Sequence, residues 1–201
     1  MAKLDCASLP PDIPEDVNAE LHQCSKYHVD LSKIALYALR EEFTETDLRK
    51  ACTAIHDTYL QNVFPGKDSS AVSEFVFPAP DWTSTPAHVQ MTIQELLRYH
   101  VLGFDKGWKD SAGKNEGDLD WYPFGFALIM SRNRKSEGIV FVHCDPRNGE
   151  DWTSFKTGTC VLPIEEVGIA LFSVQWGDDD FEKIQEMAPD MWKKREERGE
   201  V

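Results

Sequence analysis

The sequence Ile169-Ala-Leu-Phe-Ser-Val-Gln-Trp-Gly-Asp-Asp-Asp-Phe-Glu182 joins an apolar run to a group of acids. The run from Val167 to Trp176 is β-prone and predicts a strand that ends at the following glycine. A helix is expected to begin at Asp178 and to continue to about Ala188. The fold is therefore predicted to turn here from a buried strand into an acidic helix start.

These acids have two interpretations. In the first, Asp178 is only the helix N-cap, and the other acids suit the positive end of the helix dipole. In the second, Asp178 and Glu182 share one helix face with Asp179 beside them, and their repulsion requires a metal ion, a ligand cation or a basic side chain. Because ligands often bind beyond the carboxyl ends of strands, the second interpretation predicts a socket for a cationic substrate.

The composition predicts one acidic domain over residues 1–201, with residues 1–20 as an irregular arm. The chain has 35 Asp and Glu against 21 Lys and Arg, a formal net charge of −14. This charge argues against a basic coat for DNA or RNA, although it permits a local basic patch. No apolar run is long enough to span a membrane, and no signal-peptide core is present, so a soluble cytoplasmic protein without a membrane partner is expected.

The order of the expected elements indicates an α+β fold. Thr44 with Asp47, and Thr92 with Glu95, resemble capping boxes that begin helices. N-terminal helices are expected to pack on a mixed or antiparallel sheet of about four to five strands, followed by C-terminal helices. The expected helices cover 31–42, 45–62, 92–102, 178–188 and a segment from Pro189; the expected strands cover 73–77, 124–130, 138–144, 160–162 and 167–176; polar loops are expected at 105–120 and 145–158.

Candidate site residues outside the acidic group are few. His143 and Cys144 are strand neighbours whose side chains point to opposite faces, so they cannot form a nucleophile–base pair. We expect His143 and Trp176 to contact a substrate. The five cysteines form no Cys-x-x-Cys pair, which suggests neither a disulfide framework nor a zinc site.

Basic residues gather in two places where an RNA backbone could dock. One is the connector that carries Arg132, Arg134 and Lys135. The other is the terminal segment from Lys193 to Arg198. A solvated surface is the ordinary role of such groups.

Asp178-Asp179-x-x-Glu182 resembles the Asp-Asp-x-x-Glu motif of the fungal arginine-containing cyclodipeptide synthases. The resemblance covers five residues, of which three are fixed. It implies an enzyme of secondary-metabolite biosynthesis that joins arginine from arginyl-tRNA to the aminoacyl group of a second aminoacyl-tRNA and cyclises the product to a cyclo(Arg-Xaa) diketopiperazine. Aminoacyl esters are already activated, so the resemblance implies no ATP, no metal and no cofactor.

The same resemblance assigns roles to individual residues. Asp178, Asp179 and Glu182 become the catalytic residues, with one of the two aspartates on the arginine guanidinium and Glu182 near the α-amine. Any tRNA contact then falls to the Arg132–Lys135 connector and the terminal helix.

Two other resemblances lead to different functions. The acids are similar to the first aspartate-rich motif of class I terpene and prenyl synthases, but those proteins are larger and all-helical. Trp121-Tyr-Pro-Phe-Gly125, followed by strands and a late helix, resembles SMI1/KNR4-type (SUKH) domains. This second resemblance implies a non-enzymatic module whose acidic surface binds a basic protein partner. A metal-dependent enzyme that uses the same acids is a third alternative.

Overall fold

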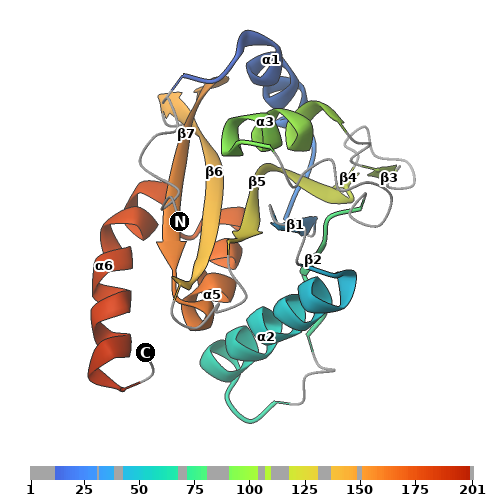
Figure 1. The fold of residues 1–201 in the computed structure, drawn as a ribbon. Coiled ribbons are helices and arrows are strands. Elements are labelled where there is room, and N and C mark those ends of the chain that lie inside the picture. Colours follow the sequence, from blue (N-terminus) through green and yellow to red (C-terminus); the bar gives the residue numbers. More distant parts are fainter. Residues whose placement is uncertain are drawn as a thin grey trace.

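The computed structural model describes residues 12–30, 32–38, 43–67, 72–80, 91–103, 107–109, 118–130, 137–148 and 151–199. Its centre is a five-stranded sheet in the order β2-β1-β5-β6-β7 (Figure 1). β1 (Lys33–Ala38) is parallel to β2 (Val76–Pro78) and to β5 (Trp121–Ile129). β5, β6 (Ile139–Asn148) and β7 (Asp151–Leu162) form an antiparallel meander. The predicted α+β class with a mixed sheet is confirmed.

Helices cover both faces of this sheet. On one face α2 (Glu45–Val63) packs against α5 (Ile164–Gln175), and α6 (Phe181–Glu197) runs alongside β7 (Figure 1). On the other face α1 (Glu15–Cys24) contacts η4 (Tyr99–Gly103), a π-helical turn that continues α3 (Ile93–Arg98). A small pair of strands, β3 (Trp108–Lys109) and β4 (Asp118–Leu119), lies apart from the main sheet.

Both predicted capping boxes are present. The Thr44 hydroxyl accepts a hydrogen bond from the Asp47 N–H at 3.2 Å, and α2 begins at the next residue after Thr44. Thr92 accepts from the Glu95 N–H at 3.2 Å and begins α3. Each cap satisfies backbone donors that the helix cannot pair, which typically contributes about 1 kcal/mol.

The helix predicted over 31–42 is wrong, because residues 33–38 form strand β1. Every side chain from Ile34 to Ala38 is buried, since β1 lies between two other strands and under helices on both faces. A strand buried on both faces shows no apolar–polar alternation, so a short apolar run of this kind does not distinguish strand from helix.

The strand predicted over 167–176 is also wrong, because this run belongs to helix α5. Its buried residues recur three and four positions apart, at Val167, Ala170, Leu171 and Val174. The helix is apolar on most sides because it is packed between α2 and the sheet. Pro163 before the helix and two glutamates in its first turn are start signals that favoured this outcome.

The polar loop predicted over 145–158 is instead the far half of the β6–β7 hairpin, which pairs Asp145 with Lys156 and Pro146 with Phe155. α1 supports it: the Asn18 side chain donates to the Thr153 carbonyl at 3.0 Å and accepts from the Phe155 N–H at 2.9 Å. α1 begins at Glu15, so the irregular arm predicted over 1–20 does not extend that far.

The remaining boundaries differ in smaller ways. The strand expected at 73–77 is β2, three residues long. The helices expected from Asp178 and from Pro189 are one helix, α6, which begins at Phe181 and continues through the proline. Its apolar face against β7 is continuous, and this packing outweighs the hydrogen bond that Pro189 cannot donate. Most of the expected 105–120 loop and the connector at 131–136 lie outside the described residues.

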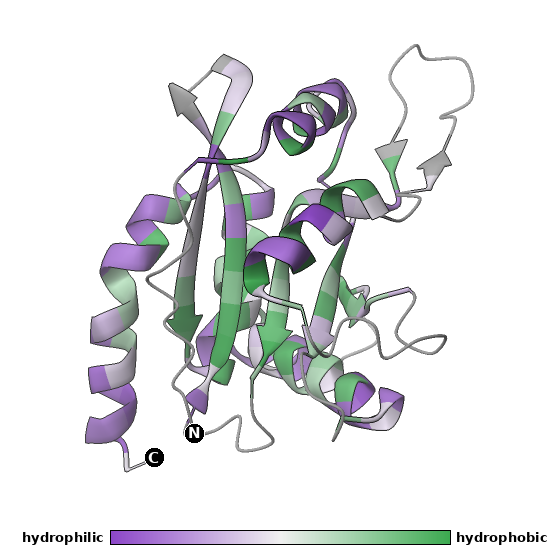
Figure 2. Cartoon of the chain, turned by 45° about the horizontal axis from the view of Figure 1, so that its top comes forward, coloured by the Kyte–Doolittle hydropathy of each residue, from purple (hydrophilic) through white to green (hydrophobic). Residues whose placement is uncertain are grey.

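The buried apolar side chains form one core cluster around the sheet. Figure 2 shows strands that are largely hydrophobic and a mostly hydrophilic α6. Among the described residues, no helix combines the length and apolar character needed to cross a membrane.

Gly168 tests the close packing of α5 on α2. A Cβ at this position would lie 2.8 Å from the Ile55 carbonyl oxygen and 2.7 Å from the Tyr59 Cβ, and neither atom can move freely. We expect Gly168→Ala to lower the free energy of unfolding by about 1 kcal/mol, because overpacking costs about 1–3 kcal/mol and the better helix propensity of alanine returns about 1 kcal/mol.

Urea unfolding measures this change. Thr46→Ala on the exposed side of α2 serves as the control and should be close to neutral. A more stable Gly168→Ala protein would contradict the packing of α5 against α2.

Candidate functional site

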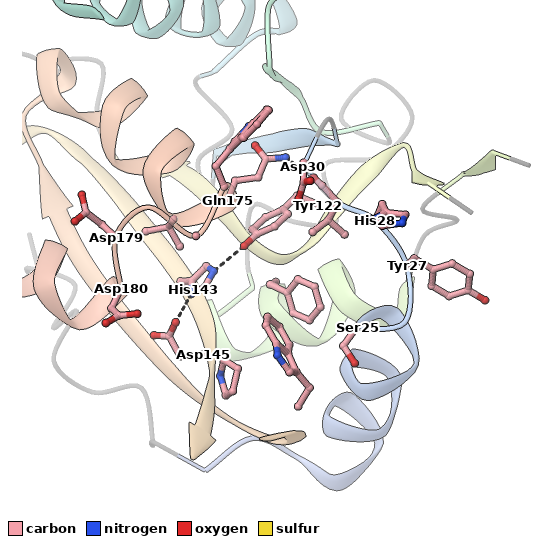
Figure 3. A pocket seen from close by; sticks show the side chains of 17 residues that line it. Ser25, Tyr27, His28, Asp30, Tyr122, His143, Asp145, Gln175, Asp179 and Asp180 are labelled. Carbon is pink, nitrogen blue, oxygen red and sulfur yellow. Dashed lines mark hydrogen bonds and ion pairs between the residues drawn. The ribbon is translucent and has the colours of Figure 1, made fainter. Parts of the chain in front are cut away.

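A pocket of about 380 Å³ lies at the end of the sheet where β5 begins and β6 leaves the core (Figure 3). Four parts of the chain line it: the segment after α1, the first residues of β5, the β6–β7 hairpin and the turn between α5 and α6. Its volume is within the range of small-molecule sites. The acidic turn therefore adjoins the beginning of β5, and not the carboxyl end of a preceding strand as predicted.

The turn between α5 and α6 is a Schellman-type helix end. Gly177 has a positive φ of 72° and donates to the Val174 carbonyl, while the Asp178 N–H donates to the Ser173 carbonyl at 2.8 Å. Asp180 is the N-cap residue of α6, but its side chain makes no capping hydrogen bond. Asp178 and Asp179 precede the helix, so the expected helix face shared by Asp178 and Glu182 does not exist.

The structure separates the acids of the Asp-Asp-x-x-Glu motif. Asp179 lines the pocket and pairs with Lys183, and its neighbour Asp180 also lines the pocket. Asp178 is exposed and is not among the lining residues. The side chain of Glu182 is 72% exposed and lies 3.3 Å from the Lys156 ammonium, outside the pocket lining.

His143 lies in the wall of the pocket with a partner on each ring nitrogen (Figure 3). The Tyr122 hydroxyl is 2.9 Å from Nε2, and an Asp145 carboxylate oxygen is 3.1 Å from Nδ1. His143 and Tyr122 are both buried. Burial, with the Asp145 carboxylate next in effect, raises the pKa of the Tyr122 hydroxyl, so this hydroxyl keeps its proton.

Two glycines make room for this histidine. Gly125 on β5 and Gly158 on β7 are its direct cross-strand neighbours. A Cβ on Gly125 would lie 2.9 Å from the His143 ring, and a Cβ on Gly158 would lie 2.4 Å from the Phe181 ring, which packs on His143. Glycine inside a strand often marks such a close approach.

Exposed aromatic rings surround the mouth of the pocket. Trp152 is 44% exposed and Trp176 is 47% exposed, although both are supported by other rings from behind. Trp176 stacks on Phe172 with 5.3 Å between ring centroids, and Trp152 packs edge-on against Phe124 and Phe155. Supported tryptophan faces of this kind can stack on an organic cation or a nucleobase.

The lining of the pocket carries net negative charge, although Lys183 pairs with Asp179 from outside the lining. Asp30, Asp145, Asp179 and Asp180 line it, whereas no lysine or arginine does among the described residues. Figure 3 places Asp145 and Asp180 on one side of the pocket and Asp30 beside Tyr122 on the other. The described residues include no group of three or more His, Cys, Asp or Glu that is arranged to hold a metal ion. Carboxylates interleaved with aromatic rings suit a flat organic cation.

The two cysteines of the later strands are not placed to act as nucleophiles. Cys144 is buried on the face opposite His143, and burial, with Asp145 second, raises the pKa of its thiol well above the usual value. Cys160 is also buried. A thiol in this state is a packing group and not an activated nucleophile.

The expected RNA-docking residues are only partly described. Arg132, Arg134 and Lys135 lie outside the described residues. Arg195 is fully buried, 3.6 Å from Glu165, and is therefore not part of a basic surface as predicted. Lys193 and Lys194 are exposed on α6.

Sequence reasoning missed several pocket residues. Tyr122, Asp145 and Asp30 were given no role in the site. The one local signal for this region was Gly125 inside a β-prone run. Comparisons with protein-family models, with curated proteins and with solved structures find no match to this chain.

The charge of the pocket predicts selective binding of guanidinium compounds. Arginine methyl ester should bind, and citrulline methyl ester, its neutral analogue, should not. Asp180→Asn should weaken the binding about ten-fold or more, since one charge-assisted hydrogen bond contributes about 1.5–3 kcal/mol. Asparagine is an equally good N-cap, so α6 should be unaffected.

Isothermal titration calorimetry measures these affinities. Asp190→Asn, an equal change of charge at an exposed position on the same helix, is the matched control. Equal losses of affinity in both variants would mean that binding depends only on the overall charge of the protein.

Cys144 provides a separate test of the site. Iodoacetamide should leave it unmodified in the native protein and modify it in urea, because its buried thiol stays protonated. Peptide mapping by mass spectrometry detects the modification. Cys144→Ala should cost about 1 kcal/mol of stability through lost packing. Rapid labelling of native Cys144 would show that it is a reactive thiol.

Proposed function

We propose that this chain is a cytoplasmic, tRNA-dependent cyclodipeptide synthase that condenses arginine from arginyl-tRNA with a second aminoacyl group into cyclo(Arg-Xaa). The observation that carries the proposal is the pocket, in which four aspartates and two exposed tryptophans occur without a lining lysine or arginine among the described residues. Guanidinium uses both kinds of group, because carboxylates accept its N–H donors and aromatic rings stack on its flat face. The motif resemblance supplies the reaction class.

The reaction requires the protein only to position the two esters and to transfer protons. Both acyl groups arrive as activated esters, so no ATP is consumed. One α-amine attacks the other ester and releases a tRNA hydroxyl, and a second attack closes the ring and releases the other tRNA. The protein must hold both esters and accept the amine proton.

The pocket residues divide these tasks. We assign the guanidinium to Asp180 and Asp145, with the ring of Trp176 stacked on it. Trp152 offers a second aromatic face for the terminal base of a tRNA. Glu182, which pairs with Lys156 outside the pocket, is assigned no contact with the amine.

Product analysis tests this proposal. Purified protein is incubated with total charged tRNA, and cyclo(Arg-Xaa) is sought by mass spectrometry. Ribonuclease treatment should abolish the product. Asp180→Asn should reduce product formation about ten-fold or more at limiting arginyl-tRNA, whereas Asp190→Asn should not.

The absence of any cyclo(Arg-Xaa) from the wild-type reaction would overturn the proposal. In that case a SUKH-type binding module would become the better interpretation. Such a module predicts a basic protein partner and no small-molecule product.

A further inference from the structure

A chain of three polar side chains runs along one side of the pocket: Tyr122, His143 and Asp145 (Figure 3). The Tyr122 hydroxyl is 2.9 Å from His143 Nε2, and Asp145 is 3.1 Å from Nδ1. All three residues line the pocket, and each comes from the end of β5 or β6 that borders it. A buried hydroxyl and a buried imidazole are costly without partners, so each holds the other in place.

The imidazole is held tightly. Its ring is stacked with Tyr122 at 21° and is covered by Phe181 at a centroid distance of 5.4 Å. Gly125 and Gly158 leave space for the His143 and Phe181 rings on the two neighbouring strands. This packing fixes the orientation of the ring, as a group that transfers protons requires.

The carboxylate fixes the direction of proton movement. Asp145 beside Nδ1 favours the tautomer with its proton on Nδ1, which leaves Nε2 as the acceptor for the Tyr122 O–H. The Asp145 oxygen does not make a hydrogen bond with Nδ1, so the carboxylate acts on the ring through its charge. Tyr122 also lines the pocket, although it is only 4% exposed.

We propose that Tyr122 is the catalytic residue for proton transfer in aminoacyl transfer at this pocket, with His143 as its proton acceptor and Asp145 as the positioning residue. As the α-amine nitrogen bonds to the ester carbonyl carbon, it gives a proton to the Tyr122 oxygen, which passes its own proton to His143 Nε2. When the ester C–O bond breaks, the same protons return and reach the departing ribose oxygen. The products are an amide and a free hydroxyl, and the protein is unchanged.

The role of Tyr122 rests on the proposed function. Loss of its hydroxyl should slow turnover and leave the binding of arginine methyl ester unchanged. Tyr122→Phe keeps the ring and removes only the hydroxyl. It should slow cyclo(Arg-Xaa) formation about 100-fold or more, the typical contribution of a general acid–base group. Its affinity for arginine methyl ester should stay within about two-fold of wild type, since the acidic contacts are unchanged. Tyr59→Phe, which removes another buried tyrosine hydroxyl, is the control and should retain full turnover.

Two further variants separate chemistry from structure. Asp145→Asn should slow turnover and also weaken the binding of arginine methyl ester, because an amide neither stabilises the imidazolium nor pairs with the guanidinium. His143→Ala should be nearly inactive and should regain turnover when imidazole is added, an effect that a purely structural histidine would not give. Thermal unfolding checks that each variant is folded.

The outcomes distinguish the two proposals. Wild-type product with normal turnover by Tyr122→Phe would overturn the role of Tyr122 and leave the proposed function intact. A parallel loss of binding and turnover in Tyr122→Phe, together with no rescue of His143→Ala by imidazole, would assign the three residues to structure alone. Absence of product from the wild type would overturn both proposals.

Discussion

The packing of Phe181 on His143 is the contact on which the site depends. Phe181 is the first residue of α6, and its ring occupies the space left by Gly158 on β7. This contact fixes the beginning of α6 against the sheet, so the acidic turn that precedes the helix must lie at the pocket. The Schellman-type end of α5 delivers the chain to that position through the positive φ of Gly177. An aromatic contact in the core thus places surface carboxylates next to a buried histidine.

The resulting pocket combines two properties that are costly to maintain. Four aspartates line the pocket without a lining lysine or arginine among the described residues, although Asp179 pairs with Lys183, and a hydrogen-bonded tyrosine and histidine are buried beside them. Folding alone would favour apolar side chains in such a place, since buried polar groups contribute stability only when they are fully paired. A cationic ligand can pair with the carboxylates that lack a basic partner in the lining. The exposed faces of Trp152 and Trp176 add the apolar part of that ligand surface.

Local signals were sufficient for part of the fold. The capping boxes at Thr44 and Thr92 depend on residues three positions apart, and both predicted helices are present. The α5 run and the β1 run were misassigned because each is buried on several sides, which removes the periodicity that separates helix from strand. The hairpin beyond Asp145 was missed because its support comes from α1, more than a hundred residues earlier in the chain. Tertiary contacts decided these elements.

The candidate site, like the fold, was predicted only in part from the sequence. His143, Trp176 and Asp179 were singled out by sequence and line one pocket, whereas Asp178 and Glu182 are outside it because α6 begins at Phe181. Tyr122 reaches His143 from the neighbouring strand β5, a relation that no local pattern encodes, whereas Asp145 shares a face with His143 because the two lie two residues apart on β6.

The most direct test of the acidic pocket is a crystal structure of the protein with arginine methyl ester bound. If the pocket grips a cationic substrate, the guanidinium will lie within hydrogen-bonding distance of Asp180 or Asp145 and beside the Trp176 ring. An ester bound elsewhere on the surface, or one whose guanidinium points away from these aspartates into solvent, would contradict it.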